Sequence, residues 1–329
     1  MPGGYMSGRI VHVDQLLSQM AINYRPQGFI ADQVFPTVTV MKQTDLYLIF
    51  EQADLFRADD TKRSRGTEAQ KISYRTSSAS YFAENYALKA DVTLEDRLNA
   101  DPAFVAEFEQ GRTRRVLDKL LLAQEVRVSS LCMATASVGS SAATASAWDD
   151  PVNANPLIDA QTVIDNVEGA TGYRPNRLLF GGDAWRHFRR NNNVKNAAIN
   201  MPSGPNVSGG GKFPSTQEVA ALLEVEEILV GRAFLNSAQQ GIAQTLARIW
   251  PDSLLAFYAP AAPSTQEPSF GYKFRWAVPG LPNMQVERHP FDSRRKVDEL
   301  EIGYYQDEVI TATALGFLLT NVLSSGTGI

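Results

Sequence analysis

The stretch from Asp101 to Met133, DPAFVAEFEQGRTRRVLDKLLLAQEVRVSSLCM, predicts the longest helix of the chain. Asp101 can accept hydrogen bonds from the free N–H groups of a first turn, and Pro102 stands where its missing N–H has no consequence. Apolar residues then recur three and four positions apart, as on one buried face of a helix. An unbroken helix of this length would span roughly 50 Å, and Gly111 is a position where it could be interrupted or kinked.

The two faces of this predicted helix differ in polarity. The apolar face comprises Val105, Phe108, Leu117, Leu120, Leu121, Gln124, Val128 and Leu131. The charged residues lie mostly off that face and are expected in water: Arg112, Arg114, Arg115, Asp118, Lys119, Glu125 and Arg127. Amphipathic helices occur in most folds, so by itself this helix also fits an ordinary helix lying across the sheet of an α/β enzyme.

Composition limits the class of protein. With 329 residues, of which 44% are hydrophobic, the chain can bury a large core in one large domain or two smaller ones. The formal net charge of -5 gives no overall attraction for nucleic acid, although it is compatible with a local basic patch. Cys132 is the single cysteine, so no disulfide can form within the chain, and its place on the apolar face predicts a small buried side chain. Neither a signal peptide nor a membrane span is predicted.

Residues 44–79 predict a long hairpin that stands off the body. Strand-forming residues from Asp45 to Phe50 precede a polar segment with almost nothing to bury, and strand character returns after Lys71. The tip of the hairpin carries Arg57, Asp59, Asp60, Lys62, Arg63, Arg65 and Glu68. A charged segment is more often an ordinary surface loop, but two long strand-like arms would be poorly stable without a neighbour to lie on. Before the hairpin, residues 1–43 predict an arm that packs on something else.

The remainder of the chain predicts a mixed α+β architecture with an antiparallel sheet near the C-terminus. Helices are predicted at Pro156–Val167, from Asp183 through Phe188, and at Thr216–Leu223. Strands are predicted at Arg177–Phe180, Glu227–Phe234, Leu254–Tyr258, Phe270–Trp276, Met284–Phe291, Glu299–Tyr305 and Val309–Thr313. The last three strands are expected to form a meander with tips at Asp292–Asp298 and Gln306–Asp307, and a loop is expected over Asn191–Pro214.

Catalytic, cofactor and metal signatures fail when they are compared residue by residue. Gly209 to Lys212 read GGGK, but a phosphate-binding loop requires glycine where Asn206 stands and serine or threonine where Phe213 stands. No Gly-x-Ser-x-Gly segment occurs, and the three histidines and one cysteine lack metal-ligand spacing. The sequence therefore predicts no enzyme, no cofactor and no metal. An α+β enzyme with a site assembled from distant residues stays open as the less favoured alternative.

Three stretches resemble the major capsid proteins of tailed bacteriophages, the family with the Hong Kong-phage-type shell fold. Glu84–Leu88, continuing through Asn99–Pro102 into Leu120–Glu125, is similar to the family's entry into its spine helix. Tyr173–Trp185 resembles the strand and helix of the axial domain, and Trp250–Tyr258 resembles a later strand of that domain. Each stretch is weakly specific alone, but their order and spacing are fairly specific and cover nearly the whole chain.

The resemblance implies a division into regions. These are an N-terminal arm (1–43), an extended hairpin loop (44–79), a peripheral domain holding the spine helix (80–152 and 284–312), and an axial domain (153–283) to which 313–329 returns. Family members lay the hairpin across the neighbouring subunit, so the tip residues named above are candidate contacts between subunits. Arg294, Arg295 and Lys296 are candidates for a loop near three-fold contacts.

The same resemblance implies a structural function. Such chains form hexamers and pentamers in an icosahedral shell, which is assembled in the host cytoplasm and becomes the capsid of the virion. The shell encloses double-stranded DNA without sequence-specific binding and has no membrane. The chain begins almost at the arm, so a separate scaffolding protein is expected, together with a portal and, as a further candidate, a decoration protein. A bacterial encapsulin nanocompartment, which shares the fold and encloses a cargo enzyme, is the alternative.

Overall fold

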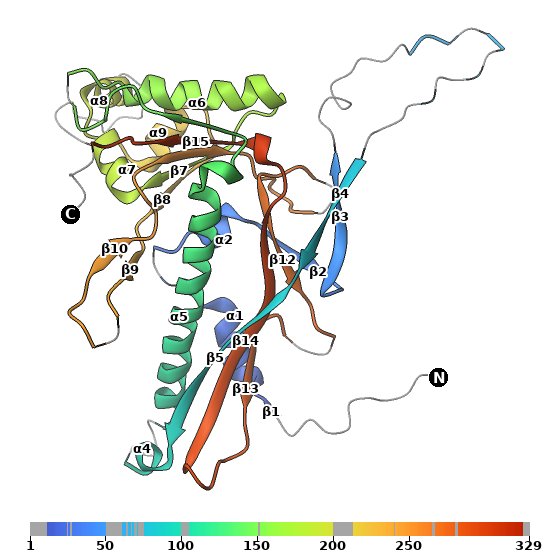
Figure 1. Cartoon of the computed structure of the whole chain (residues 1–329), viewed down its shortest axis with the longest axis vertical. Coiled ribbons are helices and arrows are strands. Elements are labelled where there is room, and N and C mark those ends of the chain that lie inside the picture. Colours follow the sequence, from blue (N-terminus) through green and yellow to red (C-terminus); the bar gives the residue numbers. More distant parts are fainter. Residues whose placement is uncertain are drawn as a thin grey trace.

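The computed structural model describes residues 12–24, 26, 28–50, 61–63, 65–66, 68, 71, 76–99, 105–150, 152–199, 213–239, 241–264, 267–279 and 282–324. Within these ranges the chain forms a six-stranded sheet, a five-stranded sheet and two two-stranded hairpins. One long helix, α5, descends from the five-stranded sheet, and strands of the six-stranded sheet run beside its lower half (Figure 1). The fold is the mixed α+β architecture that the sequence predicts.

Helix α5 spans Val105–Met133, 29 residues, and is therefore about 44 Å long at about 1.5 Å per residue. It continues through Gly111 without interruption, and the predicted start at Asp101 and Pro102 lies outside the described residues. The predicted apolar face is buried at Leu117, Leu120, Leu121, Gln124 and Val128. Cys132 is also fully buried, as its position on that face predicts.

The six-stranded sheet is organised around one long strand, β14. Its strands are β1 (His12–Val13), β2 (Thr37–Val40), β5 (Glu84–Thr93), β12 (Gly271–Trp276), β13 (Gln285–Arg288) and β14 (Val297–Ile310). One edge of β14 pairs with β5, and the other edge pairs first with β13 and then with β12. All three pairings are antiparallel, so the predicted antiparallel sheet is present and β14 is its centre.

The predicted turn at Gln306–Asp307 is wrong, because both residues lie inside β14. Gln306 is fully buried; its side-chain oxygen accepts a hydrogen bond from Arg275, at 2.6 Å, and its amide donates to Glu308, at 2.7 Å. Polar residues that would suit a turn are thus satisfied by neighbouring side chains. The strand continues where the local pattern predicts a turn.

The five-stranded sheet has the order β6-β15-β11-β7-β8. Its strands are β6 (Ser140–Ala143), β7 (Arg177–Gly181), β8 (Glu227–Gly231), β11 (Leu254–Phe257) and β15 (Gly316–Thr320). Helices α6 (Pro156–Thr171), α7 (Gly182–Phe188), α8 (Asn192–Ile199) and α9 (Thr216–Leu222) belong to this half of the molecule (Figure 1). β15 was not among the predicted strands; it inserts between β6 and β11, and all but its last residue are buried.

Helix α8 corrects the predicted loop over Asn191–Pro214. The side chain of Asn191 accepts a hydrogen bond from the backbone N–H of Asn193, at 2.9 Å, which satisfies a donor of the first helical turn. Val194 on the next turn is buried in the core of this half. Asparagines that suggest a loop therefore start a helix here. Residues 200–212 lie outside the described ranges.

The N-terminal arm packs on its own chain. The shorter elements are α1 (Gln15–Asn23), α2 (Ala31–Val34), α4 (Leu94–Asn99) and the 3₁₀ turns η1 (Thr135–Ser137) and η2 (Thr313–Leu315). Leu17 and Ala21 of α1 are buried in a core shared with α5 and β13. The hydroxyl of Ser18 accepts a hydrogen bond from the backbone N–H of Val286, at 3.1 Å. β2 then extends the six-stranded sheet by pairing parallel to β12.

The boundaries of the two sheets differ from those of the predicted domains at two segments. β12 falls within 153–283, the predicted axial domain, but it pairs with β14 and β2 in the six-stranded sheet. β6 falls within 80–152, the predicted peripheral domain, but it pairs with β15 in the five-stranded sheet. The chain therefore crosses between the two sheets within each of these ranges, and strand pairing with distant segments decides where it crosses. As a statement about capsomer position, the peripheral and axial division stays a prediction.

A buried ion pair joins the arm to β12 and makes stability depend on pH. Lys273 is 1% exposed and pairs with Asp32 of α2, and burial lowers the pKa of Lys273 to about 8 from its ordinary value of 10.5. The native state therefore binds fewer protons than the unfolded chain between these two pH values. Stability contributed by this group should rise with pH across that window, by at most about 3 kcal/mol.

We expect Lys273→Met to abolish this rise. The loss of stability from removing one partner of the pair should be limited, because the Asp32 carboxylate is 31% exposed and keeps the hydrogen bond from Gln124. Urea unfolding at pH 7.5, 9 and 10 measures the free energy of unfolding of the wild type and of Lys273→Met. In the difference between the two proteins, the titration of the other groups cancels. Lys119→Met, on an exposed lysine of α5, is the control and should keep the wild-type pH dependence. An unchanged pH profile in Lys273→Met would contradict the assignment.

Candidate assembly site

The predicted hairpin is present and is anchored on the six-stranded sheet. β3 (Thr44–Phe50) and β4 (Thr76–Phe82) pair antiparallel along their whole length. Tyr47 and Tyr81 are buried on one face of the hairpin, and their rings lie 5.3 and 4.6 Å from the ring of Phe274 in β12. Figure 1 shows β3 and β4 at the side of the molecule, away from α5.

The opposite face of the hairpin is exposed and carries two large apolar side chains. Leu46 is 65% exposed and Phe82 is 53% exposed. Both lie on the same face, because Leu46 pairs with Ser80 and Phe82 pairs with Thr44, and side chains two residues apart on a strand share a face. Two-stranded ribbons are marginal in water, and exposed apolar patches commonly mark contacts with other proteins. This outer face of the hairpin is a candidate surface for a neighbouring subunit.

The charged tip is only partly within the described residues. Arg57, Asp59 and Asp60 lie outside them. The described members of the predicted set, Lys62, Arg63, Arg65 and Glu68, are all exposed. Exposure is what a contact between subunits requires, but it does not identify the partner, so the role of the tip stays a prediction.

The turn between β13 and β14 carries the three basic residues that the sequence predicts near three-fold contacts. Arg294, Arg295 and Lys296 are exposed, and the carboxylate of Asp292 accepts hydrogen bonds from the backbone N–H groups of Arg294 and Arg295 at 2.9 and 3.4 Å. Arg295 forms ion pairs within the chain, to Asp91 at 2.7 Å and to a glutamate of β14 at 2.6 Å. Among the described residues, neither Arg294 nor Lys296 pairs with a carboxylate. These two cations are therefore the ones available to a partner.

Sequence reasoning misplaced one residue that organises this region, Glu125. The prediction put it in water, but its side chain is 0% exposed. Its carboxylate accepts hydrogen bonds from the backbone N–H groups of Ile30 and Ala31, both at 2.9 Å, and from the indole N–H of Trp250 at 2.6 Å. Glu125 follows Leu121 by four residues and precedes Val128 by three, and this spacing on the apolar face was the available signal.

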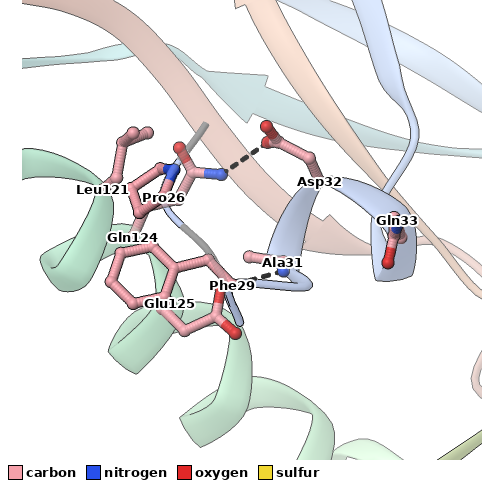
Figure 2. A pocket seen from close by; sticks show the side chains of 8 residues that line it. All are labelled: Pro26, Phe29, Ala31, Asp32, Gln33, Leu121, Gln124 and Glu125. Atoms are coloured by element: carbon pink, nitrogen blue, oxygen red, sulfur yellow. Dashed lines mark hydrogen bonds between the residues drawn. The ribbon is translucent and has the colours of Figure 1, made fainter. Parts of the chain in front are cut away.

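The surroundings of Glu125 hold the arm against the spine helix. Burial raises the pKa of Glu125, and the three donors oppose that rise. Beside it, the amide of Gln124 donates to Asp32 at 2.8 Å (Figure 2). A pocket of about 210 Å³ lies here, lined by Pro26, Phe29, Ala31, Asp32, Gln33, Leu121, Gln124 and Glu125. Because the arm leads into β2 and the hairpin, this contact fixes where the hairpin leaves the body.

Membrane and metal features were also sought in the described residues. None of the helices described is both long and apolar enough to cross a membrane. Within the same residues, no three histidine, cysteine, aspartate or glutamate side chains gather as a metal site would require.

The whole chain is similar to known phage proteins, although no protein-family profile matches it. The major capsid protein of Pseudomonas phage JBD67 is 27% identical over 330 residues, which cover 97% of this chain and 100% of the relative. A phage-related protein from Bordetella bronchiseptica RB50 has a TM-score of 0.71 at 21% identity and covers 95% of this chain and 98% of its own.

Two further solved structures share the fold at lower identity. The capsid of cyanophage P-SCSP1u has a TM-score of 0.55 at 10% identity, covering 97% of this chain and 92% of its own. The SrpI encapsulin of Synechococcus elongatus PCC 7942 has a TM-score of 0.52 at 12% identity, covering 97% and 99%. The long helix, the hairpin and the two sheets thus make up the Hong Kong-phage-type capsid fold, which shell-forming proteins share. Within that class, this chain is similar over nearly its full length to the major capsid protein of a Pseudomonas phage.

Proposed function

We propose that this chain assembles, as hexamers and pentamers, into the icosahedral shell that encloses the double-stranded DNA genome of a tailed phage. The observation that carries the proposal is the relationship to a phage major capsid protein over 97% of the chain. The hairpin supports it, because the exposed apolar face at Leu46 and Phe82 suits a surface that another subunit covers. The place of the chain is then the virion capsid, after assembly in the host cytoplasm.

The proposed contacts follow from the exposed charged sets. The hairpin tip would lie on a neighbouring subunit, and Arg294 and Lys296 would reach a partner near the three-fold contacts. The net charge of -5 favours a shell that holds DNA weakly and without reading its sequence. A separate scaffolding protein, a portal and a decoration protein are the further partners proposed. No catalytic role is proposed, in keeping with the structural role of the named relative.

An encapsulin shell is the second candidate, favoured by the similarity to the SrpI encapsulin. That similarity is at 12% identity and reflects the common fold, whereas the JBD67 relationship is at 27% identity over the full length of both proteins. The phage function is therefore the better supported of the two.

Expression of the full chain, alone and with scaffolding proteins from phages with similar capsid genes, tests the proposal. Negative-stain electron microscopy should show closed shells, and sedimentation velocity should show large particles that form as concentration rises. A compact monomer at every concentration, with scaffolding protein supplied, would refute the shell function. Particles that copurify with a cargo enzyme and without a requirement for scaffold would favour the encapsulin instead.

A further inference from the structure

A basic pocket lies beside α7, β8 and a small hairpin formed by β9 (Phe234–Asn236) and β10 (Leu246–Arg248), and its volume is about 410 Å³. Its lining includes four arginines and two aromatic residues: Arg186, Arg189, Arg232, Arg248, Trp185 and Phe234. Among the described residues that line it, none is acidic. We call it the arginine pocket. It stands out in a chain whose net charge is -5.

The positive charge of the arginine pocket is only partly neutralised by the protein. Asp183 of α7 accepts from Arg248 at 2.8 Å and pairs with Arg186 at 2.5 Å. Within the described part of the chain, Arg189 and Arg232 pair with no carboxylate. The charges of Asp183 and Arg248 act on the nearby carboxyl group of Asp252, but four guanidinium groups still face at most two carboxylates among the described residues. The pocket therefore has an excess of donors and of positive charge.

The arginines are held in place before any ligand arrives. Arg248 lies over the ring of Phe234, with its guanidinium carbon 4.6 Å from the ring centre. Arg189 lies 5.3 Å from the ring centre of Phe213, and its Nε is buried with no hydrogen-bond partner in the described structure. Buried donors in proteins are normally satisfied, so this unpaired donor beside a pocket is available to an acceptor that the described residues do not supply.

We propose that the arginine pocket binds phosphate groups. A single carboxylate would leave most of the excess charge unpaired. A free phosphate, or two successive phosphates of a nucleic-acid backbone, carries about two charges and several acceptor oxygens that several guanidinium groups can share. The phosphates can come from the backbone of a nucleic acid or from a free polyphosphate. The inference concerns the isolated subunit and does not depend on shell formation.

Isothermal titration calorimetry on the full chain tests the proposal with inorganic pyrophosphate and, separately, with a single-stranded thymidine 12-mer. We expect Arg189→Gln combined with Arg232→Gln to weaken binding of the ligand at least about tenfold, because these arginines have no carboxylate partner among the described residues. Arg190→Gln is the matched control, since Arg190 is an exposed neighbour outside the lining, and it should weaken binding less than about twofold. Arg232→Gln alone keeps the test valid if the double variant misfolds.

The outcomes separate the sources of phosphate. Loss of both ligands in the double variant assigns the pocket to the nucleic-acid backbone, and a variant-specific loss of pyrophosphate alone assigns it to free polyphosphates. Equal losses in Arg190→Gln and the double variant would show diffuse surface attraction and overturn the site. Glutarate binding as tightly as pyrophosphate, or no binding of either phosphate ligand, would also overturn it.

Discussion

Glu125→Ala is expected to lower the free energy of unfolding by about 3 kcal/mol or more, because it leaves three buried donors without their acceptor. Two of these donors are backbone N–H groups of the arm, and the third is the indole of Trp250, which is fully buried. The substitution therefore removes two contacts of α5 at once: its hydrogen bonds to the arm and its hydrogen bond to Trp250. Urea unfolding followed by circular dichroism measures the change.

Lys119→Ala is the matched control, since Lys119 is exposed on the same helix, and it should change stability by less than about 0.5 kcal/mol. Glu125→Gln retains one acceptor oxygen but adds an amide donor among the three donors. Its loss of stability should therefore lie between the losses of Glu125→Ala and Lys119→Ala. A loss below about 1 kcal/mol for Glu125→Ala would show that the carboxylate does not hold the arm in place.

The second large effect is expected at the hairpin tip. Between Arg57 and Arg75 the sequence has six basic and three acidic residues, so the segment carries a local charge of +3 in a chain of -5. Its natural partner is acidic. Each exposed ion pair contributes on the order of 0.2 to 1 kcal/mol, but the same pairs recur at every subunit of a closed shell.

We therefore expect simultaneous replacement of Lys62, Arg63 and Arg65 by glutamate to leave the subunit folded, because these side chains are exposed and do not pack in the core. The yield of shells should fall about tenfold or more and become more sensitive to salt, since each reversed charge replaces an attraction with a repulsion. Circular dichroism reports the fold, and particle counts by electron microscopy at low and high salt report assembly.

A control with the same change in net charge is available on α5. Replacement of Arg114, Arg115 and Lys119 by glutamate alters three exposed basic residues away from the hairpin. If both triple variants lose shells equally, the effect comes from total charge and not from the tip. Normal shells from the tip variant would identify the tip as an ordinary surface loop, and a misfolded subunit would place it in the core.

Much of the fold could be predicted because its signals are local. The period of the apolar residues in α5 and the strand-forming residues on both sides of the charged tip are properties of short segments. The continuation of β14 through Gln306 was missed for the opposite reason, because its hydrogen-bond partner Arg275 lies 31 residues away. Helix α8 was missed although its contact between Asn191 and Asn193 is local, because asparagine suits a turn as well as the start of a helix.

The candidate site divides in the same way. The hairpin and its charged tip, and the cations of the turn before β14, were predicted from the sequence, whereas the apolar outer face at Leu46 and Phe82 required the pairing register to assign sides. The arginine pocket has no sequence signature at all. Its four arginines come from segments between Arg186 and Arg248 that only the fold brings together.

The sequence by itself determined the long helix, the hairpin arms, the α+β class and the resemblance to phage shell proteins, since each depends on spacing and composition along the chain. Only the tertiary structure decided that Glu125 is buried. A charged residue on the apolar face can be buried only if donors surround it, and those donors, at Ile30 and Trp250, lie 95 and 125 residues away. No local pattern contains that information, because the energy of a buried charge depends on partners that folding alone brings within hydrogen-bond distance.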